Sequence, residues 1–275
     1  NTELLLTRAC RRERRMLFSS LTFIFLFLPV VLAVYYLAPL KIRNLLLLLA
    51  SLIFYAWGEP VYVVLMILSI LLNYCCGREI AANAEDERKA HRGMIFTVVV
   101  NLALLFFFKY YGFFLELVNS VTSAELTYRE LALPVGISFY TFQGISYVVD
   151  VYRGKAKAQR SLLNFALYIA LFPQLIAGPI VRYEDIEPQL AQRKVSARKL
   201  GQGAMLFLIG LAKKAVLADT FKTIFEEISA ISASNLSVPM AWIGCITYAF
   251  EIYYDFSGYS DMAIGLSRMF GFELK

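Results

Sequence analysis

Long stretches without charge recur along this chain and leave few folds open to it. The clearest of them are residues 21–40, 45–57, 61–72 and 94–108. A helix that spans a bilayer needs about 20 mostly apolar residues, and several of these runs reach that length once their flanks are included. Hydrophobic residues make up 59% of the 275 residues and charged residues only 17%; ordinary globular domains carry about 25%. The sequence therefore predicts an all-α, polytopic membrane protein.

The net charge of +6 fits basic loops at a membrane surface. No base-reading motif accompanies it, so we do not expect nucleic acid as a partner. The four cysteines show no CxxC or Cys/His spacing, and we predict neither a metal site nor a bound cofactor. Buried apolar packing is the expected role of these cysteines.

We expect roughly eight or nine hydrophobic helical segments, one of them broken or re-entrant. Charged or polar connections are expected at residues 77–93 and 219–238, and a tight turn at 58–60. The expected helical segments are residues 17–40, 43–57, 61–76, 94–111, 133–149, 162–181, 201–218 and 238–255, followed by one more apolar stretch.

Lysines and arginines in the short loops predict the orientation. The loops at 41–43 and 77–93 carry two and four of them, which places both loops in the cytoplasm. The five arginines of residues 1–15 would then lie outside, against the rule. Our hypothesis is that translation starts at Met16 and that residues 1–15 are a basic extension that is not native; finding them at the N-terminus of the natively expressed protein would exclude it.

Two segments combine apolar and polar character. Residues 133–149 predict a spanning helix with a polar face that includes Gln143. Residues 162–181 contain Pro173, Gly178 and Pro179 and lie between two basic loops, which favours a re-entrant element over a full span. Broken backbone at membrane depth persists only when it is buried in protein or lines a cavity.

Residues 251–265 are unusually polar for a segment with apolar sequence on both sides. They contain three carboxylates, two serines and three tyrosines. A carboxylate at bilayer depth costs about 2.5–3.5 kcal/mol on insertion scales, so such residues normally face water or the interior of a bundle. Lys213 and Lys214 lie inside an apolar helix and must snorkel or face water. We therefore expect a wet passage here, lined by these residues: Glu251, Asp255, Ser257, Tyr259, Ser260 and Asp261.

Three motifs resemble the membrane-bound O-acyltransferase family, in its alginate O-acetylase-like branch. They are LPVGISFYTFQ at 133–143 with YVVDVYRG at 147–154, FPQLIAGPIVRY at 172–183, and DFSGYSDMAIG at 255–265. The resemblance begins near Met16, so residues 16–275 are interpreted as the N-terminal part of a single transmembrane domain. One departure is Glu251, where the family more often has glutamine; the extra carboxylate needs a partner such as a lysine.

The resemblance implies a multi-pass enzyme of the bacterial inner membrane. An acyl group, most simply acetyl from cytoplasmic acetyl-CoA or another thioester, would move towards hydroxyls of an exported or cell-envelope polysaccharide or towards an extracytoplasmic partner acetyltransferase. The family's catalytic histidine lies downstream of the third motif, so no catalytic residue is assigned, and a chain ending at Lys275 is expected to be inactive.

Other interpretations stay open at this point. His91 is expected to be a surface residue, and Ser257 or Ser260 has no base nearby in sequence to make it a nucleophile. The serines are instead expected to hold a broken helix by hydrogen bonds. Arg182 either meets phosphates of the donor or is a plain surface arginine. A transporter or channel subunit, and a non-catalytic scaffold of a polysaccharide export complex, are the alternative functions.

Overall fold

The computed structural model describes residues 16–122, 133–175, 181–232 and 234–274, and no strand occurs among them. The chain divides into two compact units. The described residues of the first unit are 39–122, 133–175 and 181–191, and those of the second are 16–38, 192–232 and 234–274. Three helices are long and apolar enough to cross a membrane, over Leu40–Gly58, Tyr62–Ala82 and Glu87–Val121. The all-α, membrane-protein prediction is thereby confirmed.

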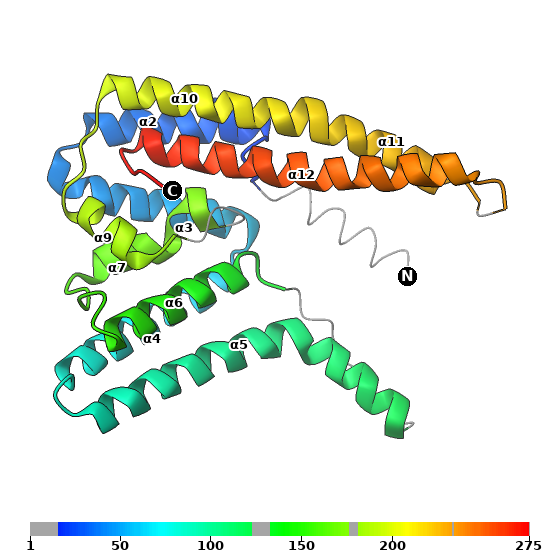
Figure 1. The fold of residues 1–275 in the computed structure, drawn as a ribbon. Coiled ribbons are helices and arrows are strands. Elements are labelled where there is room, and N and C mark those ends of the chain that lie inside the picture. Colours follow the sequence, from blue (N-terminus) through cyan, green and yellow to red (C-terminus); the bar gives the residue numbers. More distant parts are fainter. Residues whose placement is uncertain (1–15, 123–132, 176–180, 233, 275) are drawn as a thin grey trace. The chain divides into compact units, whose positions relative to one another are not determined.

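The first unit is built from seven α-helices among its described residues. Of these, α4, α5 and α6 pack against one another, and α7 packs against α3 (Figure 1). The helices are α3 (Arg43–Gly58), α4 (Tyr62–Ala82), α5 (Glu87–Thr122), α6 (Ile137–Tyr152), α7 (Leu162–Ala170), α8 (Phe172–Leu175) and α9 (Tyr183–Ala191).

A reciprocal amide pair joins α4 to α5. Asn73 donates from Nδ2 to Oδ1 of Asn101 at 3.2 Å, and Asn101 donates back to Oδ1 of Asn73 at 3.0 Å. Both side chains are buried. Gly144 on α6 leaves room for this pair, since an added Cβ would lie 2.7 Å from Cγ of Asn73. The amide pair thus joins α4 to α5, and the glycine lets α6 approach it closely, where lipid provides no hydrophobic driving force for association.

The expected connection at residues 77–93 is wrong in its extent. Helix α4 continues to Ala82 and α5 begins at Glu87, so only residues 83–86 connect them. Arginine, glutamate, lysine and alanine are good helix formers, and their charge marks the membrane surface rather than the end of a helix. His91 therefore lies on the first turns of α5, exposed as expected, with Nδ1 3.2 Å from Oη of Tyr152.

The broken segment is observed as far as the described residues allow. Helix α7 ends at Ala170, Leu171 takes a non-helical conformation (φ −55°, ψ 111°), and α8 follows. The backbone N–H of Phe172 donates to Oγ of Ser51 at 3.1 Å, which satisfies a donor that the break exposes. Gly178 and Pro179 lie outside the described residues.

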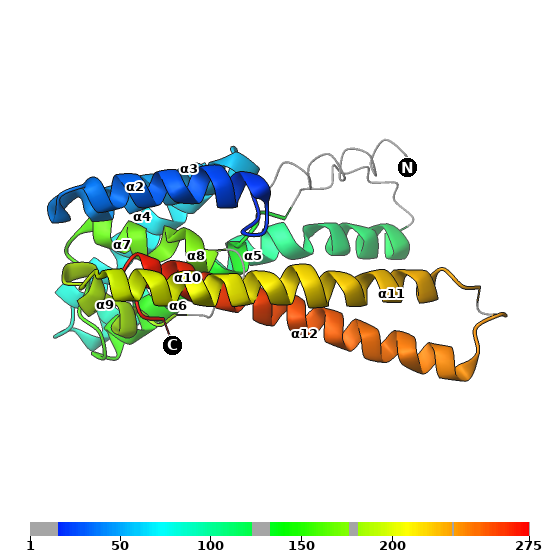
Figure 2. The same ribbon diagram turned by 90° about the horizontal axis from the view of Figure 1, so that it is seen from above.

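The second unit consists of a short N-terminal helix and a long antiparallel pair. The first is a π-helical turn, η1 (Phe23–Phe27), continued by α2 (Leu28–Leu37), which ends before Pro39 with Ala38 extended, three residues short of the expected end at residue 40. The pair is formed by α10 (Ala197–Ala212), the π-helical η3 (Lys213–Ala218) and α11 (Asp219–Ser229), which make one continuous rod, and by α12 (Val238–Met269) alongside it (Figures 1 and 2).

Two expectations for this unit are wrong. Much of the predicted loop at 219–238 is helix α11, whose Phe221 and Phe225 pack against aromatic residues of α12. Charged residues around these aromatic residues obscure the helical periodicity of the segment in the sequence. The predicted break within residues 251–265 is absent, and α12 runs through them without interruption. Gly258 and Gly265 do not break the helix because they serve close packing against α10.

Candidate functional site

Two pairs of glycines bring α10 and α12 into backbone contact. A Cβ added to Gly203 would lie 2.6 Å from the carbonyl oxygen of Gly265, and one added to Gly265 would lie 2.7 Å from that of Gly203. Gly210 and Gly258 face each other in the same way one heptad further along α10. Small residues at matching positions are how membrane helices approach closely. They fix the register in which the charged residues of the two elements meet.

Beyond the second glycine pair, the two lysines of η3 meet the carboxylates of α12. Lys213 Nζ lies 2.6 Å from Asp261 Oδ2 and donates to Ser257 Oγ at 3.1 Å. The neighbouring Lys214 Nζ pairs with Asp255 Oδ1 and lies 3.7 Å from Asp219 Oδ1. We call Lys213, Lys214, Asp255, Ser257 and Asp261 the lysine–aspartate cluster.

The two ion pairs differ in their access to solvent. The side chains of Lys213 and Asp261 are 32% and 22% exposed, whereas that of Asp255 is 53% exposed. In apolar surroundings an unpaired charge is strongly unfavourable, and a hydrogen-bonded pair of opposite sign reduces that cost. We call Lys213 and Asp261 the inner pair. Because the Ser257 hydroxyl is a further hydrogen-bond partner of Lys213, this pair is the part of the cluster best suited to act on a bound group.

The backbone of η3 is wider than an α-helix at the point where its lysines begin. π-Helical turns are rare and are frequent at functional sites. This one places consecutive lysines so that each reaches a different carboxylate of α12, Asp261 for Lys213 and Asp255 for Lys214. The departure from α-helical geometry therefore lies in η3 and not in residues 251–265 of α12.

The remaining predicted residues of α12 surround the cluster in different ways. Tyr259 stacks on Phe18 with ring centroids 4.7 Å apart, and its Oη is buried without a hydrogen-bond partner among the described residues. Ser260 is half-buried. Glu251 is also half-buried, and within the described part of the chain it has no ion-pair partner, so the lysine expected for it is not found there.

Gln143 and Arg182 belong to the first unit. Gln143 is buried on α6, and its Oε1 accepts no hydrogen bond from the described residues. Arg182 precedes α9; its side chain is 68% exposed and lies 3.6 Å from a carboxylate oxygen of Glu184. The structure thus brings together Asp255, Ser257 and Asp261, and it leaves the roles of Gln143 and Arg182 as predictions.

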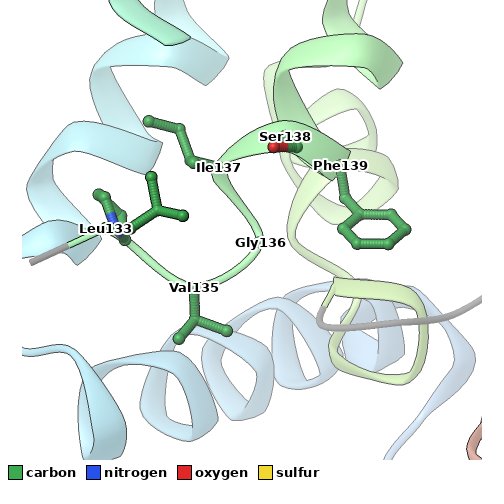
Figure 3. A pocket seen from close by; sticks show the side chains of 7 residues that line it. Leu133, Val135, Gly136, Ile137, Ser138 and Phe139 are labelled. Carbon is green, nitrogen blue, oxygen red and sulfur yellow. The ribbon is translucent and has the colours of Figure 1, made fainter. Parts of the chain in front are cut away.

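The first motif also lines a cavity. Its volume is about 480 Å³, and it is bordered by residues 133–139, where the chain enters α6 (Figure 3). Gly136 shapes this entry with a positive φ of 74°, and an added Cβ there would lie 2.5 Å from the carbonyl oxygen of Leu175. Among the described residues, the lining is apolar except for Ser138. The cavity could accept an apolar group, and its described lining includes no charged side chain.

Sequence reasoning missed the pairing of the two lysines with α12. The available signal was chemical: two cations in one apolar helix and three carboxylates in another must find partners of opposite sign. Their separation along the chain hid the pairing, since Lys213 and Asp261 are 48 residues apart.

These features define a helical membrane protein with ion pairs between two long, antiparallel helical elements. Residues 158–275, which include the whole lysine–aspartate cluster, match the family model described as MBOAT, membrane-bound O-acyltransferase family. The chain belongs to this family.

Curated relatives extend the similarity over nearly the whole chain. A probable alginate O-acetylase AlgI of Pseudomonas aeruginosa is 42% identical over 262 residues, covering 94% of this chain and 50% of the relative. A peptidoglycan O-acetyltransferase of Helicobacter pylori is 34% identical over 291 residues (94% and 55%). A teichoic acid D-alanyltransferase of Bacillus subtilis is 26% identical over 193 residues (68% and 47%). The chain spans about half the length of the curated relatives it matches.

Proposed function

We propose that this chain forms the part of a membrane O-acyltransferase that carries the polar section of the acyl-transfer path. The acyl group is acetyl, the donor is a cytoplasmic thioester such as acetyl-CoA, and the acceptor is a hydroxyl of an exported or cell-envelope polysaccharide or of an extracytoplasmic partner acetyltransferase. The enzyme is placed in the bacterial inner membrane as a multi-pass protein.

The observation that carries the proposal is the inner ion pair within the family-matched region. Asp261 holds the Lys213 ammonium 2.6 Å away, and that ammonium also donates to the Ser257 hydroxyl. A charge held in place in a mostly apolar region can stabilise charge that develops in a transition state more strongly than a solvated one can. Alginate O-acetylase and peptidoglycan O-acetyltransferase relatives support acetyl transfer to a polysaccharide.

The proposed reaction divides the roles between groups. The acceptor hydroxyl oxygen attacks the thioester carbonyl carbon, the carbon–sulfur bond breaks, and the thiol leaves with the proton that a general base takes from the hydroxyl. The base is the histidine that the family resemblance implies downstream of residue 265. Lys213 would donate a hydrogen bond to the carbonyl oxygen as it gains negative charge, and Asp261 would hold Lys213 in position.

The test uses the protein expressed from its complete open reading frame in bacterial membranes. Transfer of labelled acetyl to polysaccharide is measured for Lys213→Met and Asp261→Asn, with protein amounts matched by immunoblot. We expect each to lower kcat by about 10²-fold or more, the size of effect seen when one transition-state donor is removed. Lys199→Met, which disrupts the pair with the exposed carboxylate of Glu273 outside the cluster, is the control and should retain activity. Unchanged kcat in both cluster variants would contradict the proposal.

A transporter remains the alternative, with the same intramembrane charges as an ion path. Asp255 and Asp261 are each paired with a lysine, which neutralises the carboxylates that such a path would use. Ion flux in proteoliposomes separates the two functions. Flux that is lost in Asp261→Asn would favour the transporter over the acyltransferase.

A further inference from the structure

A second concentration of charge lies in the first unit, in the connection between α6 and α7. This connection carries four cations, and no carboxylate occurs between residues 151 and 161. All four side chains are exposed, and none forms an ion pair with another described residue. We call the segment the basic loop; its cations are Arg153, Lys155, Lys157 and Arg160.

The basic loop is held in a defined conformation at both of its ends. At the start, Gly154 adopts a positive φ of 69°, and the backbone N–H groups of Lys155 and Ala156 both donate to the carbonyl oxygen of Asp150, at 2.9 and 3.2 Å. Ala156 is buried. The loop therefore presents its cations from an ordered backbone and not from a freely moving segment.

Gln159 anchors the other end on buried aromatic residues. Its backbone N–H donates to Oη of Tyr147 at 3.1 Å, and its side-chain Nε2 donates to Oη of Tyr183 at 2.9 Å. Its Oε1 accepts from the backbone N–H of Ser161 at 3.1 Å, just before α7 begins. Three hydrogen bonds from one residue fix the position of the loop against the first unit.

A contact with α4 fixes the depth of the basic loop along the membrane normal. Tyr74 Oη donates to the carbonyl oxygen of Arg160 at 2.7 Å, and Arg78 Nη1 donates to the same Tyr74 Oη at 3.4 Å. Tyr74 lies in the last turns of the candidate span Tyr62–Ala82, about 12 Å before its end at 1.5 Å per residue. Tyrosine and arginine near the end of a span mark the level of the lipid headgroups.

We infer that the basic loop, together with Arg78, binds the phosphate groups of anionic phospholipids. Five cations lie at headgroup level and outnumber the three nearby carboxylates, Glu79, Asp150 and Glu187, so the surface is positive. Each lysine or arginine close to an anionic membrane surface contributes to binding, and arginine pairs with phosphate through two parallel hydrogen bonds. The cations lie along an open loop at a depth where lipid phosphates are always present, which favours a lipid over a soluble phosphate.

The experiment compares the complete protein with two matched variants. In the neutral variant, the four loop cations become glutamine; in the charge-conserving variant, Arg153→Lys, Lys155→Arg, Lys157→Arg and Arg160→Lys keep every positive charge. Each protein is purified in mild detergent, and phosphatidylglycerol that co-purifies is quantified by mass spectrometry. Each is also melted in phosphatidylcholine nanodiscs with and without phosphatidylglycerol.

We expect the natural and charge-conserving proteins to retain phosphatidylglycerol and to melt at a higher temperature when it is present. The neutral variant should retain at least about tenfold less and lose the shift in Tm. Equal retention and an equal shift in all three proteins would overturn the inference. Inorganic pyrophosphate is the last arm: stabilisation of the natural protein by pyrophosphate, without any effect of phosphatidylglycerol, would also overturn it and would indicate a soluble phosphate ligand.

Discussion

Gly210 and Gly258 face each other so closely that neither position has room for a side chain. A Cβ added to Gly210 would lie 2.5 Å from the carbonyl oxygen of Gly258, and one added to Gly258 would lie 2.7 Å from that of Gly210. Backbone atoms cannot rotate away as a flexible side chain can. The contact therefore sets the distance between α10 and α12 immediately beside the lysine–aspartate cluster.

The first prediction is that Gly258→Ala separates these helices and destabilises the protein. Overpacking at a tight contact costs about 1–3 kcal/mol, and we expect a lower Tm in detergent by thermal unfolding. Gly201→Ala on α10 is the matched control, because an added Cβ meets nothing within 4 Å there. In that exposed helical position alanine should stabilise by about 0.5–1 kcal/mol. Equal effects at the two glycines would refute the packing argument.

The second prediction concerns the coupling between Lys213 and Asp261. Removing either partner leaves the other charge unpaired in a mostly apolar region. Because both side chains retain some exposure, we expect each single variant, Lys213→Met or Asp261→Asn, to lose about 1–3 kcal/mol, between the values for surface and buried pairs.

A double-mutant cycle separates this pair from general effects of substitution. The double variant should lose clearly less stability than the two single losses added together, since neither unpaired charge remains. The same cycle on Lys199 and Glu273, a pair at 2.7 Å whose carboxylate is 62% exposed, should give a coupling below about 1 kcal/mol. Additive losses for Lys213 and Asp261 would show that the pair contributes no specific stabilisation.

The sequence predicted the helices of this fold well because apolar runs of bilayer length allow little else. The end of the first helix shortly before Pro39 and the turn at residues 58–60 follow from proline and glycine chemistry that acts locally. A break within residues 162–181 was expected from Pro173, Gly178 and Pro179; the observed end of α7 at Ala170 lies before all three. Residues 219–229 were predicted as loop because charges obscured the helical spacing of their aromatic residues.

The candidate site was only partly predictable. The cost of burying charge predicts that Asp255, Ser257 and Asp261 need polar partners. Which residues those partners are could not be predicted, because this depends on the antiparallel register of α10 and α12 and on a π-helical turn at Lys213–Ala218. From the sequence alone, the glycines at 258 and 265 have no assigned role. Their role is a close helix contact, which only the neighbouring helix reveals.

The third prediction tests the amide pair between α4 and α5. Asn73→Ala leaves the amide of Asn101 with one partner fewer, and Asn101→Ala does the same to Asn73. Each should cost about 0.6–1.7 kcal/mol, the range measured for hydrogen bonds between membrane helices. The double variant should lose less than the two losses added together, because no buried amide is left without its partner. The measurement is thermal unfolding of all four proteins in one detergent.

The fourth prediction is a dependence on pH at the end of α12. Lys199 Nζ lies 2.7 Å from Glu273 Oε1, and the hydrogen bond and charge of Lys199 lower the pKa of Glu273 below its ordinary value of 4.5. A lowered pKa in the folded state means that the pair stabilises at neutral pH, and that this contribution is lost as the pH falls through the lowered value. Residues 270–274 should therefore lose protection from hydrogen exchange in acid.

Two variants distinguish this pair from general acid unfolding. Glu273→Gln removes the titrating group, so the difference in exchange between the natural protein and the variant should be present at neutral pH and vanish in acid. Lys199→Gln removes the hydrogen bond that holds the carboxylate, so the pKa of Glu273 should return towards 4.5 in an NMR titration. A difference in exchange that persists unchanged into acid would show that the contact between Lys199 and Glu273 does not depend on the charge of the carboxylate.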